Sequence, residues 1–321
     1  MNRRLPAMGL ELPDWPLFGL AADVRPALER ARVRGEAAAL ATIVGLTEGG
    51  PRPIGTQMAF FGDAVSGFLS GGCLEADVAG HAAEVLQDGE PRRLVYGEGS
   101  PWPDIRLLCG ARIEILLERL VPDDEATGVL ISLFHERRSA LWLSDGVRRA
   151  CAAIESAPKA WRAAFSRRFD PTLRLIVLGS DPTALAIASL GVQAGFETTL
   201  ARPKGPAAPP PIAGLAYQRG EPAEALAAVG LDPFTAVAVA THEMETDHAA
   251  LIAALPSKAF FVGALGARRR VGERVAALER AGVGQEAIAR LASPIGLDLG
   301  GKAPFEIAVA VIAQILAEAH K

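Results

Sequence analysis

The chain has 321 residues, a formal net charge of −4 at neutral pH and a hydrophobic fraction of 50%, values typical of a globular protein with two domains. The acidic balance excludes a general electrostatic attraction to nucleic acid or to an anionic membrane surface. Three scattered cysteines exclude a disulfide framework, and no apolar stretch is long enough to predict a membrane span. We therefore expect a protein of the reducing cytoplasm.

Residues 1–120 predict an α+β domain. Apolar positions at helical spacing mark the two expected helices, and short apolar runs bounded by Gly and Pro mark the expected strands. A loop rich in Gly and Pro, residues 97–110, separates the last two strands. The expected helices are residues 26–34 and 74–87, and the expected strands are residues 39–46, 57–61, 64–69, 92–96 and 112–117.

Residues 121–170 have a weaker pattern, which we interpret as an annex that leads into a linker. A helix at residues 128–137 and a strand pair within residues 141–150 are expected, followed by a helix at residues 159–165. The charged stretch 166–170 precedes Pro171 and is the expected boundary between the domains.

Residues 171–321 change to alternating strands and helices, which predicts a Rossmann-like domain with a parallel sheet. The proline-rich segment 205–214 is expected to be a surface connection. The fold class that follows is α/β, with an N-terminal α+β domain and a C-terminal Rossmann-like domain. The expected strands are residues 173–178, 197–200, 236–240 and 259–262, and the expected helices are residues 182–194, 246–255 and 268–281.

The stretch Ser70-Gly71-Gly72-Cys73-Leu74-Glu75 places a thiol and a carboxylate where a predicted strand leads into a predicted helix. The two glycines allow positive φ angles and a close approach of the backbone to a ligand. Because a helix N-terminus favours negative charge, Cys73 is a candidate thiolate. The alternative is that Cys73 is a small buried hydrophobic residue.

The first strand of the second domain lacks the glycine-rich loop that binds dinucleotides. Such a loop reads G-x-G-x-x-G/A and is followed, about twenty residues later, by an acidic residue for the ribose. Here the loop positions are Gly179, Asp181 and Ala184, and Ala201 stands at the end of the second strand. We expect Asp181 to cap the following helix, with Pro182 in its first turn, and we expect no useful NAD(P) binding.

Other strand ends of this domain predict an anion site. Thr241 and His242 follow one strand, and the glycines of 263–266 and the arginines of 268–270 follow the next. In open parallel sheets the carboxyl ends of the strands share one rim. Arginines at a helix start oppose the helix dipole, which suggests an anionic partner. The alternatives are a solvated helix start for the arginines and a capping or core imidazole for His242.

Six motifs carry a resemblance to a known family: Pro51-Arg52-Pro53-Ile54-Gly55, Ser70-Gly71-Gly72-Cys73-Leu74-Glu75, Cys109-Gly110, Ala240-Thr241-His242 with Asp247, residues 262–270 and residues 294–300. In these motifs, and in their order along the chain, the sequence resembles the XdhC/CoxI family, accessory proteins for the maturation of molybdenum hydroxylases such as xanthine dehydrogenase. The resemblance covers nearly the whole chain from residue 41 onward. Its departures are Asp181 and Ala201, where family members commonly carry glycine and an acid.

The resemblance implies a protein that binds the molybdopterin form of the molybdenum cofactor as cargo, protects it during sulfuration and delivers it to a molybdenum hydroxylase apoenzyme. It also implies a cytoplasmic homodimer, with a cysteine desulfurase as a further partner. An accessory role of this kind is expected rather than an enzymatic one. Two other interpretations stay open: an NAD(P)-dependent Rossmann oxidoreductase, and a cysteine-based metal or sulfur relay protein.

If the resemblance holds, each candidate residue can be assigned to the part of molybdopterin that its chemistry suits. We expect the cofactor to bind in a cleft between the domains. Guanidinium groups and backbone amides suit its phosphate, and thiolates suit molybdenum and sulfur. Glu75 is expected to orient the thiol or to carry a proton, and Arg52 to close over the ligand. The alternatives are a buried side chain for Cys109, a helix-start charge for Glu75 and a solvated charge for Arg52. The expected catalytic residues are Cys73, Glu75 and Cys109, and the expected cofactor-binding residues are Arg52, Gly71, Gly72, Thr241, His242, Gly263, Gly266, Arg268, Arg269 and Arg270.

Overall fold

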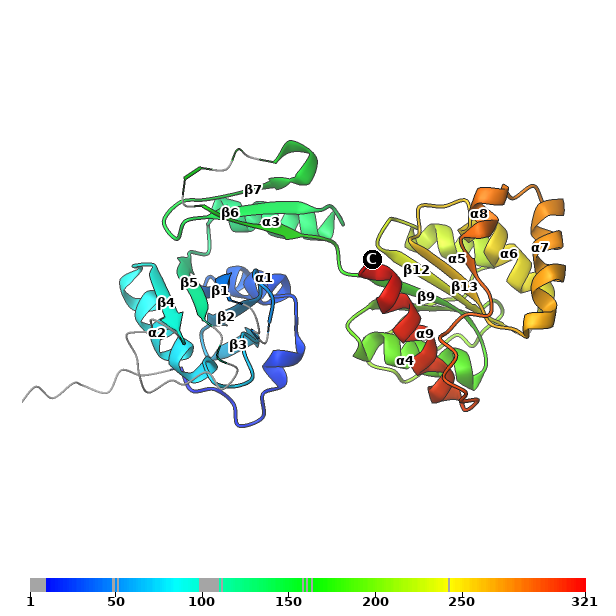
Figure 1. The fold of residues 1–321 in the computed structure, drawn as a ribbon, viewed down its shortest axis with the longest axis horizontal. Helices are drawn as coiled ribbons and strands as arrows, with labels where there is room; N and C mark the ends of the chain where they lie inside the picture. Colours follow the sequence, from blue (N-terminus) through cyan, green and yellow to red (C-terminus); the bar gives the residue numbers. More distant parts are fainter. Residues whose placement is uncertain are drawn as a thin grey trace, which may run out of the picture. The chain divides into compact units, whose positions relative to one another are not determined.

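The computed structural model divides the chain into two compact units, Met1–Pro171 and Thr172–Lys321 (Figure 1). It describes residues 10–47, 50, 52–97, 110, 112–157, 159, 161–162, 164–241 and 243–321. Among these residues, no helix combines the length and the apolar character that a bilayer crossing requires.

A five-stranded antiparallel sheet, in the order β3-β2-β1-β5-β4, forms the centre of the first unit. Its strands are β1 (Ala38–Leu46), β2 (Gln57–Phe61), β3 (Ala64–Gly67), β4 (Arg92–Tyr96) and β5 (Ile113–Leu120). Ala41 and Ile43 of β1 pack with helix α2 (Glu75–Asp88). Leu40 packs on the other face with helix α1 (Arg25–Val33), after the short 3-10 helix η1 (Leu17–Leu20). Because both faces are covered, β1 is apolar along most of its length.

A second, three-stranded antiparallel sheet in the order β7-β6-β8 completes the first unit. It contains β6 (Ala140–Ser144), β7 (Arg149–Ala153) and β8 (Phe165–Phe169), with helix α3 (Glu125–His135) before it and the short 3-10 helix η2 (Ile154–Ser156) after β7. The expected pairing of two strands within residues 141–150 is confirmed. Trp142 of β6 and Leu130 of α3 share one core with Leu28 and Leu40, so this sheet and the first sheet are packed together.

The helix expected at residues 159–165 is wrong. Phe165 begins β8, which pairs with β6, and the residues expected to form the linker supply the rest of that strand. Phe169 is buried, Phe165 and Arg167 are half-buried, and Ser166 and Arg168 between them are exposed. This is the two-residue period of a strand. Arg167 lies on the inward side of the strand and Arg168 on the outward side. Because both are charged, the sequence shows no alternation of apolar and polar residues here.

The second unit contains a six-stranded parallel sheet in the order β11-β10-β9-β12-β13-β14, as expected for a Rossmann-like domain. The strand order reverses between β9 and β12, so the ends of these two strands flank the switch point where ligands bind in such sheets. The strands are β9 (Arg174–Gly179), β10 (Glu197–Ala201), β11 (Ala216–Gln218), β12 (Thr235–Ala240), β13 (Phe261–Ala264) and β14 (Leu291–Ala292).

Helices cover both faces of this sheet (Figure 1). One face packs against α4 (Pro182–Gln193) and α9 (Pro304–Ala319), and the other against α5 (Pro222–Val229), α6 (Met244–Ala254), α7 (Val271–Arg280) and α8 (Gln285–Ala289). A short 3-10 turn, η3 (Arg268–Arg270), precedes α7. The sequence pattern did not predict β11, α5, α8, β14 or α9. Helix α9 gave no clear amphipathic pattern because it is apolar along most of its length.

Candidate functional site

A cavity of about 260 Å³ lies at the carboxyl ends of β12 and β13 in the second unit. It contains four of the residues expected to bind the cofactor: Thr241, Gly266, Arg269 and Arg270. These residues come from two loops that are 25 positions or more apart in sequence, and the parallel sheet brings the loops together at one rim. The other lining residues are Met244, Asp247, Leu265, Ala267 and Arg274.

A buried ion pair stabilises the wall of this cavity. The Nη2 atom of Arg274 lies 3.1 Å from Oδ2 of Asp247, and these residues are only 4% and 6% exposed. Arg274 also donates to Oγ of Ser293 at 2.7 Å and to the backbone oxygen of Leu265 at 3.0 Å, and the Thr241 hydroxyl donates to Oδ1 of Asp247. Because each charged group is paired and hydrogen-bonded, the pair holds the two loops in place without adding net charge to the cavity.

Sequence reasoning missed Arg274, although a signal for it exists. Arg274 lies three residues after Val271 and four before Leu278, on the face of α7 that points toward the core. A basic residue on an apolar helix face is buried only with a partner. Asp247 was noticed only as part of a family motif, and nothing in the sequence links it to Arg274.

The three consecutive arginines have different surroundings. Arg269 and Arg270 line the cavity from the exposed η3 turn, and the Nη1 atom of Arg270 lies 3.9 Å from the sulfur of Met244. Arg268 does not line the cavity and instead forms an exposed ion pair with Asp298 at 3.1 Å. Two guanidinium groups therefore give the mouth of the cavity a positive charge, and this arrangement suits a phosphate.

The two expected glycines of this loop have different structural roles. Gly266 has φ +147°, and a Cβ atom there would lie 3.2 Å from the Nη2 atom of Arg274. Gly263 lies within β13 and does not line the cavity. A Cβ atom on Gly263 would lie 2.7 Å from the side chain of Ile295, so this glycine permits close packing. His242 and Cys109 lie outside the described residues.

Cys73 is exposed in the turn that precedes α2. Gly72 has φ +97°, a conformation that favours glycine, and space is open around both Gly71 and Gly72. The backbone amide of Cys73 donates to Oγ of Ser70 at 3.2 Å. By contrast, burial raises the pKa of Cys151 to about 12 and keeps that residue a neutral thiol.

Glu75 is 2% exposed, and its carboxylate fixes this turn. One carboxylate oxygen accepts from the amides of Leu69 and Ser70 at 3.1 and 2.6 Å, and the other accepts from the Ser70 hydroxyl at 2.7 Å and the Leu74 amide at 3.2 Å. These four donors occupy the carboxylate, so Glu75 positions the backbone that presents Cys73. A direct role of Glu75 toward the thiol stays a prediction.

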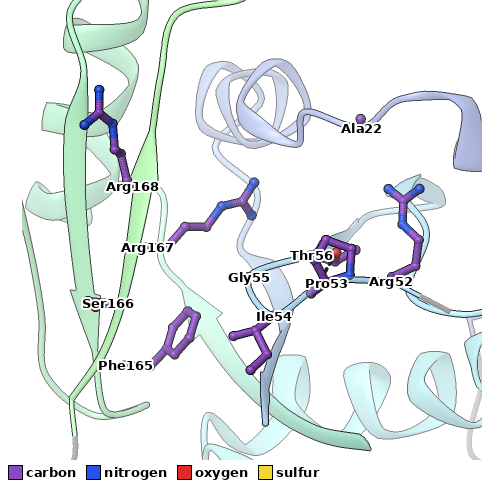
Figure 2. Close-up of a pocket in the computed structure, with 10 residues that line it drawn as sticks. All are labelled: Ala22, Arg52, Pro53, Ile54, Gly55, Thr56, Phe165, Ser166, Arg167 and Arg168. Carbon is purple, nitrogen blue, oxygen red and sulfur yellow. Dashed lines mark hydrogen bonds between the residues drawn. The ribbon is translucent and has the colours of Figure 1, made fainter. Parts of the chain in front are cut away.

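Arg52 lies in a separate pocket of about 340 Å³ within the first unit (Figure 2). The turn of residues 53–56 lies beside it, and residues of β8 form the facing wall. The sequence predicted Arg52 as a ligand-binding residue but gave no sign of its neighbours in β8, because residues 159–170 were interpreted as a helix and a linker.

The loop after β9 is occupied by its own helix cap. Oδ1 of Asp181 accepts from the amide of Ala184 at 2.8 Å, which confirms Asp181 as the N-cap of α4. A Cβ atom on Gly179 would lie 2.5 Å from the backbone oxygen of Ala240, so this glycine permits β9 and β12 to end close together. Beside this loop lie a small cavity of about 90 Å³ and a pocket of about 290 Å³ formed partly by the proline-rich segment.

Comparisons with known proteins give matches to both units. The family described as XdhC Rossmann domain matches residues 175–315, and the family described as XdhC and CoxI family matches residues 31–97. The molybdenum cofactor insertion chaperone PaoD of Escherichia coli (strain K12) is 29% identical over 287 residues, which cover 89% of this chain and 84% of PaoD. A protein of Escherichia coli (strain K12) named YqeB, described as uncharacterized, is 28% identical over 190 residues, covering 58% of this chain and 35% of YqeB.

A solved structure has the same fold. The crystal structure of a protein from Bacillus halodurans, described as a xanthine dehydrogenase, superposes with a TM-score of 0.75 at 24% sequence identity. The superposition covers 92% of this chain and 95% of the other. At this identity the likeness establishes the fold alone.

Proposed function

Because this chain belongs to the XdhC and CoxI family, we propose that it binds the molybdenum cofactor as cargo and delivers it to the apoenzyme of a molybdenum hydroxylase. The observation that carries the proposal is the match, along most of both chains, to a chaperone that inserts this cofactor in Escherichia coli. The second unit supplies a cavity with a positive mouth, where the anionic part of such a cargo finds partners.

The residues of that cavity fit the phosphate of molybdopterin. Arg269 and Arg270 are exposed on the η3 turn, where their guanidinium groups are free to form paired hydrogen bonds to phosphate oxygens. The Arg274–Asp247 pair is already satisfied within the protein, so its role is to hold the two loops at the right separation. We assign phosphate binding to Arg269 and Arg270 and positioning to Arg274.

Cys73 is the residue to which we assign contact with the sulfur-bearing end of the cargo. Its side chain is exposed on a turn fixed by Glu75 and Ser70, and a thiolate is a soft ligand suited to molybdenum and sulfur. In this proposal the protein shields the cofactor while a terminal sulfur is installed, with a cysteine desulfurase as the sulfur source. We further propose that the chain works as a homodimer in the cytoplasm.

The test is a direct measurement of cargo. The chain is produced in a host that makes the cofactor, and molybdenum and the fluorescent oxidation product of the pterin are quantified per purified chain. We expect both to remain with the parent protein and to decrease together in Arg269→Gln/Arg270→Gln. Arg280→Gln, at an exposed arginine in the last turn of α7, is the matched control and should retain the cargo. Absence of pterin from the parent protein would refute the proposal.

The alternative of an NAD(P)-dependent oxidoreductase requires a dinucleotide site, and the loop after β9 disfavours such a site. The Asp181 carboxylate lies at the start of α4, where the diphosphate of a dinucleotide would need the helix amides. A negative charge at this position repels phosphate. We therefore propose that NADH and NADPH, titrated separately against the purified chain, cause no saturable change in protein fluorescence.

A further inference from the structure

The pocket around Arg52 in the first unit contains positive charge without a matching negative charge. Its lining includes Arg52 and Arg167, which extend from opposite walls (Figure 2). The Nε atom of Arg52 and the Nη1 atom of Arg167 are shielded from solvent, and neither has a hydrogen-bond partner among the described residues. Donor atoms that are buried and unsatisfied are rare in folded proteins and suggest a missing partner.

The nearby carboxylate is already engaged. The negative charge of Asp23 favours the charged form of Arg167. The two carboxylate oxygens of Asp23, however, accept hydrogen bonds from the Nε and Nη2 atoms of Arg25 at 2.7–3.0 Å. Arg25 is itself buried and lies close to Arg167, because both guanidinium groups pack against the ring of Phe169 at 5.4 and 4.2 Å. Burial lowers the pKa of Arg167 to about 10, which leaves it charged at neutral pH. The pocket is therefore electropositive.

Three donors of the turn beside the pocket are engaged within the protein. The Gly55 amide donates to the backbone oxygen of Ile43 at 2.8 Å, and the amide and hydroxyl of Thr56 both donate to the backbone oxygen of Pro53. Gly55 has φ +90°, and a Cβ atom there would lie 3.8 Å from the aliphatic part of Arg167. The guanidinium groups of Arg52 and Arg167 carry donors without a partner among the described residues, and paired N–H donors of this kind match phosphate oxygens.

The other part of the pocket is apolar. Figure 2 shows the side chains of Phe165 and Ile54 across from each other, on the side of the pocket away from the guanidinium of Arg167. Ile54 is 52% exposed, so its side chain is accessible to a ligand in the pocket. An aromatic ring and an aliphatic side chain facing one another are suited to a flat ring between them.

We propose that this pocket is a second anion site, which binds a phosphate monoester carried on a flat ring system. Arg52 and Arg167 bind the phosphate, and Phe165 and Ile54 contact the ring. The phosphate monoester of a free nucleotide and that of a pterin share this chemistry. The site lies within the first unit and does not depend on the cargo function proposed above.

Thermal unfolding followed by tryptophan fluorescence tests the proposal in the full chain. All tryptophans of the chain belong to the first unit: Trp15, Trp102, Trp142 and Trp161. The probes are inorganic phosphate, adenosine 5′-monophosphate and a pterin monophosphate. Each ester is compared, at constant ionic strength, with the same compound without its phosphate group. We expect the phosphate esters to raise the midpoint and the forms without phosphate to leave it unchanged. The Arg269→Gln/Arg270→Gln background removes the other anion site and should preserve the effect.

Variants at the two arginines identify the site. Arg167→Gln and Arg52→Gln should each weaken binding of the phosphate esters by about tenfold or more. Arg138→Gln is the matched control, because Arg138 belongs to the first unit, does not line this pocket and forms exposed ion pairs with Glu136 and Glu155; it should retain affinity. If Arg167→Gln fails to fold, Arg52→Gln, at a turn position, decides the question.

The outcomes separate the possible ligands. A larger shift with the pterin ester than with the nucleotide identifies the pterin as the ligand, and the reverse identifies a nucleotide. No shift with any phosphate, or equal shifts in the parent, Arg167→Gln and Arg52→Gln proteins, would overturn the proposal. If Arg167→Gln or Arg52→Gln loses binding of the phosphate esters but keeps its molybdenum content, the cargo function is unaffected. The two proposals can therefore be refuted independently.

Discussion

The buried ion pair between Arg274 and Asp247 gives the sharpest quantitative prediction for the second unit. Replacing Arg274 with methionine removes the cation but keeps most of the side-chain volume. Asp247, 6% exposed, then remains as a buried carboxylate without its charged partner. Breaking a buried pair from one side costs about 3–5 kcal/mol, and each kcal/mol lowers the unfolding midpoint of a domain of this size by about 2–4 °C. We expect the second unit to unfold roughly 6–20 °C lower.

Two spectroscopic signals separate the units in one experiment. Tryptophan fluorescence follows only the first unit, because all tryptophans lie there, whereas far-ultraviolet circular dichroism follows helices and strands in both. Arg274→Met should lower the midpoint of the dichroism transition that belongs to the second unit and leave the fluorescence midpoint in place. Arg268→Met is the control, since Arg268 and its partner Asp298 are 81% and 79% exposed and such pairs contribute about 0–1 kcal/mol.

A double variant tests the electrostatic explanation itself. If the loss arises from an unpaired buried carboxylate, Asp247→Leu added to Arg274→Met should restore much of the stability, because two apolar groups need no partners. The reasoning is refuted if Arg274→Met leaves the dichroism midpoint within the range of Arg268→Met. It is also refuted if the double variant is less stable than the parent by the sum of the two single effects.

Three further predictions concern the two sites. Cys73→Ser should leave the unfolding midpoint unchanged, because the thiol is exposed, and should reduce the cofactor retained per chain; equal retention by the variant and the parent would remove Cys73 from the site. Arg269→Gln/Arg270→Gln should weaken cofactor binding and reduce its salt dependence, measured across a series of ionic strengths, and an unchanged salt slope would exclude these arginines. Gly72→Ala, at φ +97°, should destabilise the first unit by about 1 kcal/mol or more in denaturant unfolding, and no loss would show that the turn adjusts.

The parts of the fold that were predicted correctly depend on local signals. Asp181 before Pro182 predicted a helix cap because both residues act within one turn of the chain, and the Ala184 amide indeed donates to the Asp181 carboxylate. The apolar run of β9 predicted a buried parallel strand for the same reason. The β8 strand was missed because its inward positions include Arg167, and the sequence contains no sign that an arginine there packs on Phe169.

The candidate site was predictable only in part, because ion pairs between distant residues leave no local pattern. Thr241, Arg269 and Arg270 were expected at one rim because the strand ends of a parallel sheet share it, and they line one cavity. The Arg274–Asp247 contact joins residues 27 positions apart, and it became visible only with the helices in place. Gly263 shows that a glycine in a motif that suggests a ligand can also serve packing, since a Cβ atom there would lie 2.7 Å from the side chain of Ile295.

The two anion sites should respond differently to salt, and this difference follows from where their charges lie. Arg269 and Arg270 are exposed, so mobile ions screen them and phosphate binding there should fall steeply as ionic strength rises. In the other pocket, the unpartnered nitrogen atoms of Arg52 and Arg167 are shielded from solvent, and salt screens buried charges less. A phosphate there satisfies donors that are otherwise unpaired, so binding should raise the stability of the first unit even at high salt. A phosphate-induced shift of the tryptophan transition that disappears at high ionic strength would therefore contradict the placement of these two guanidinium groups.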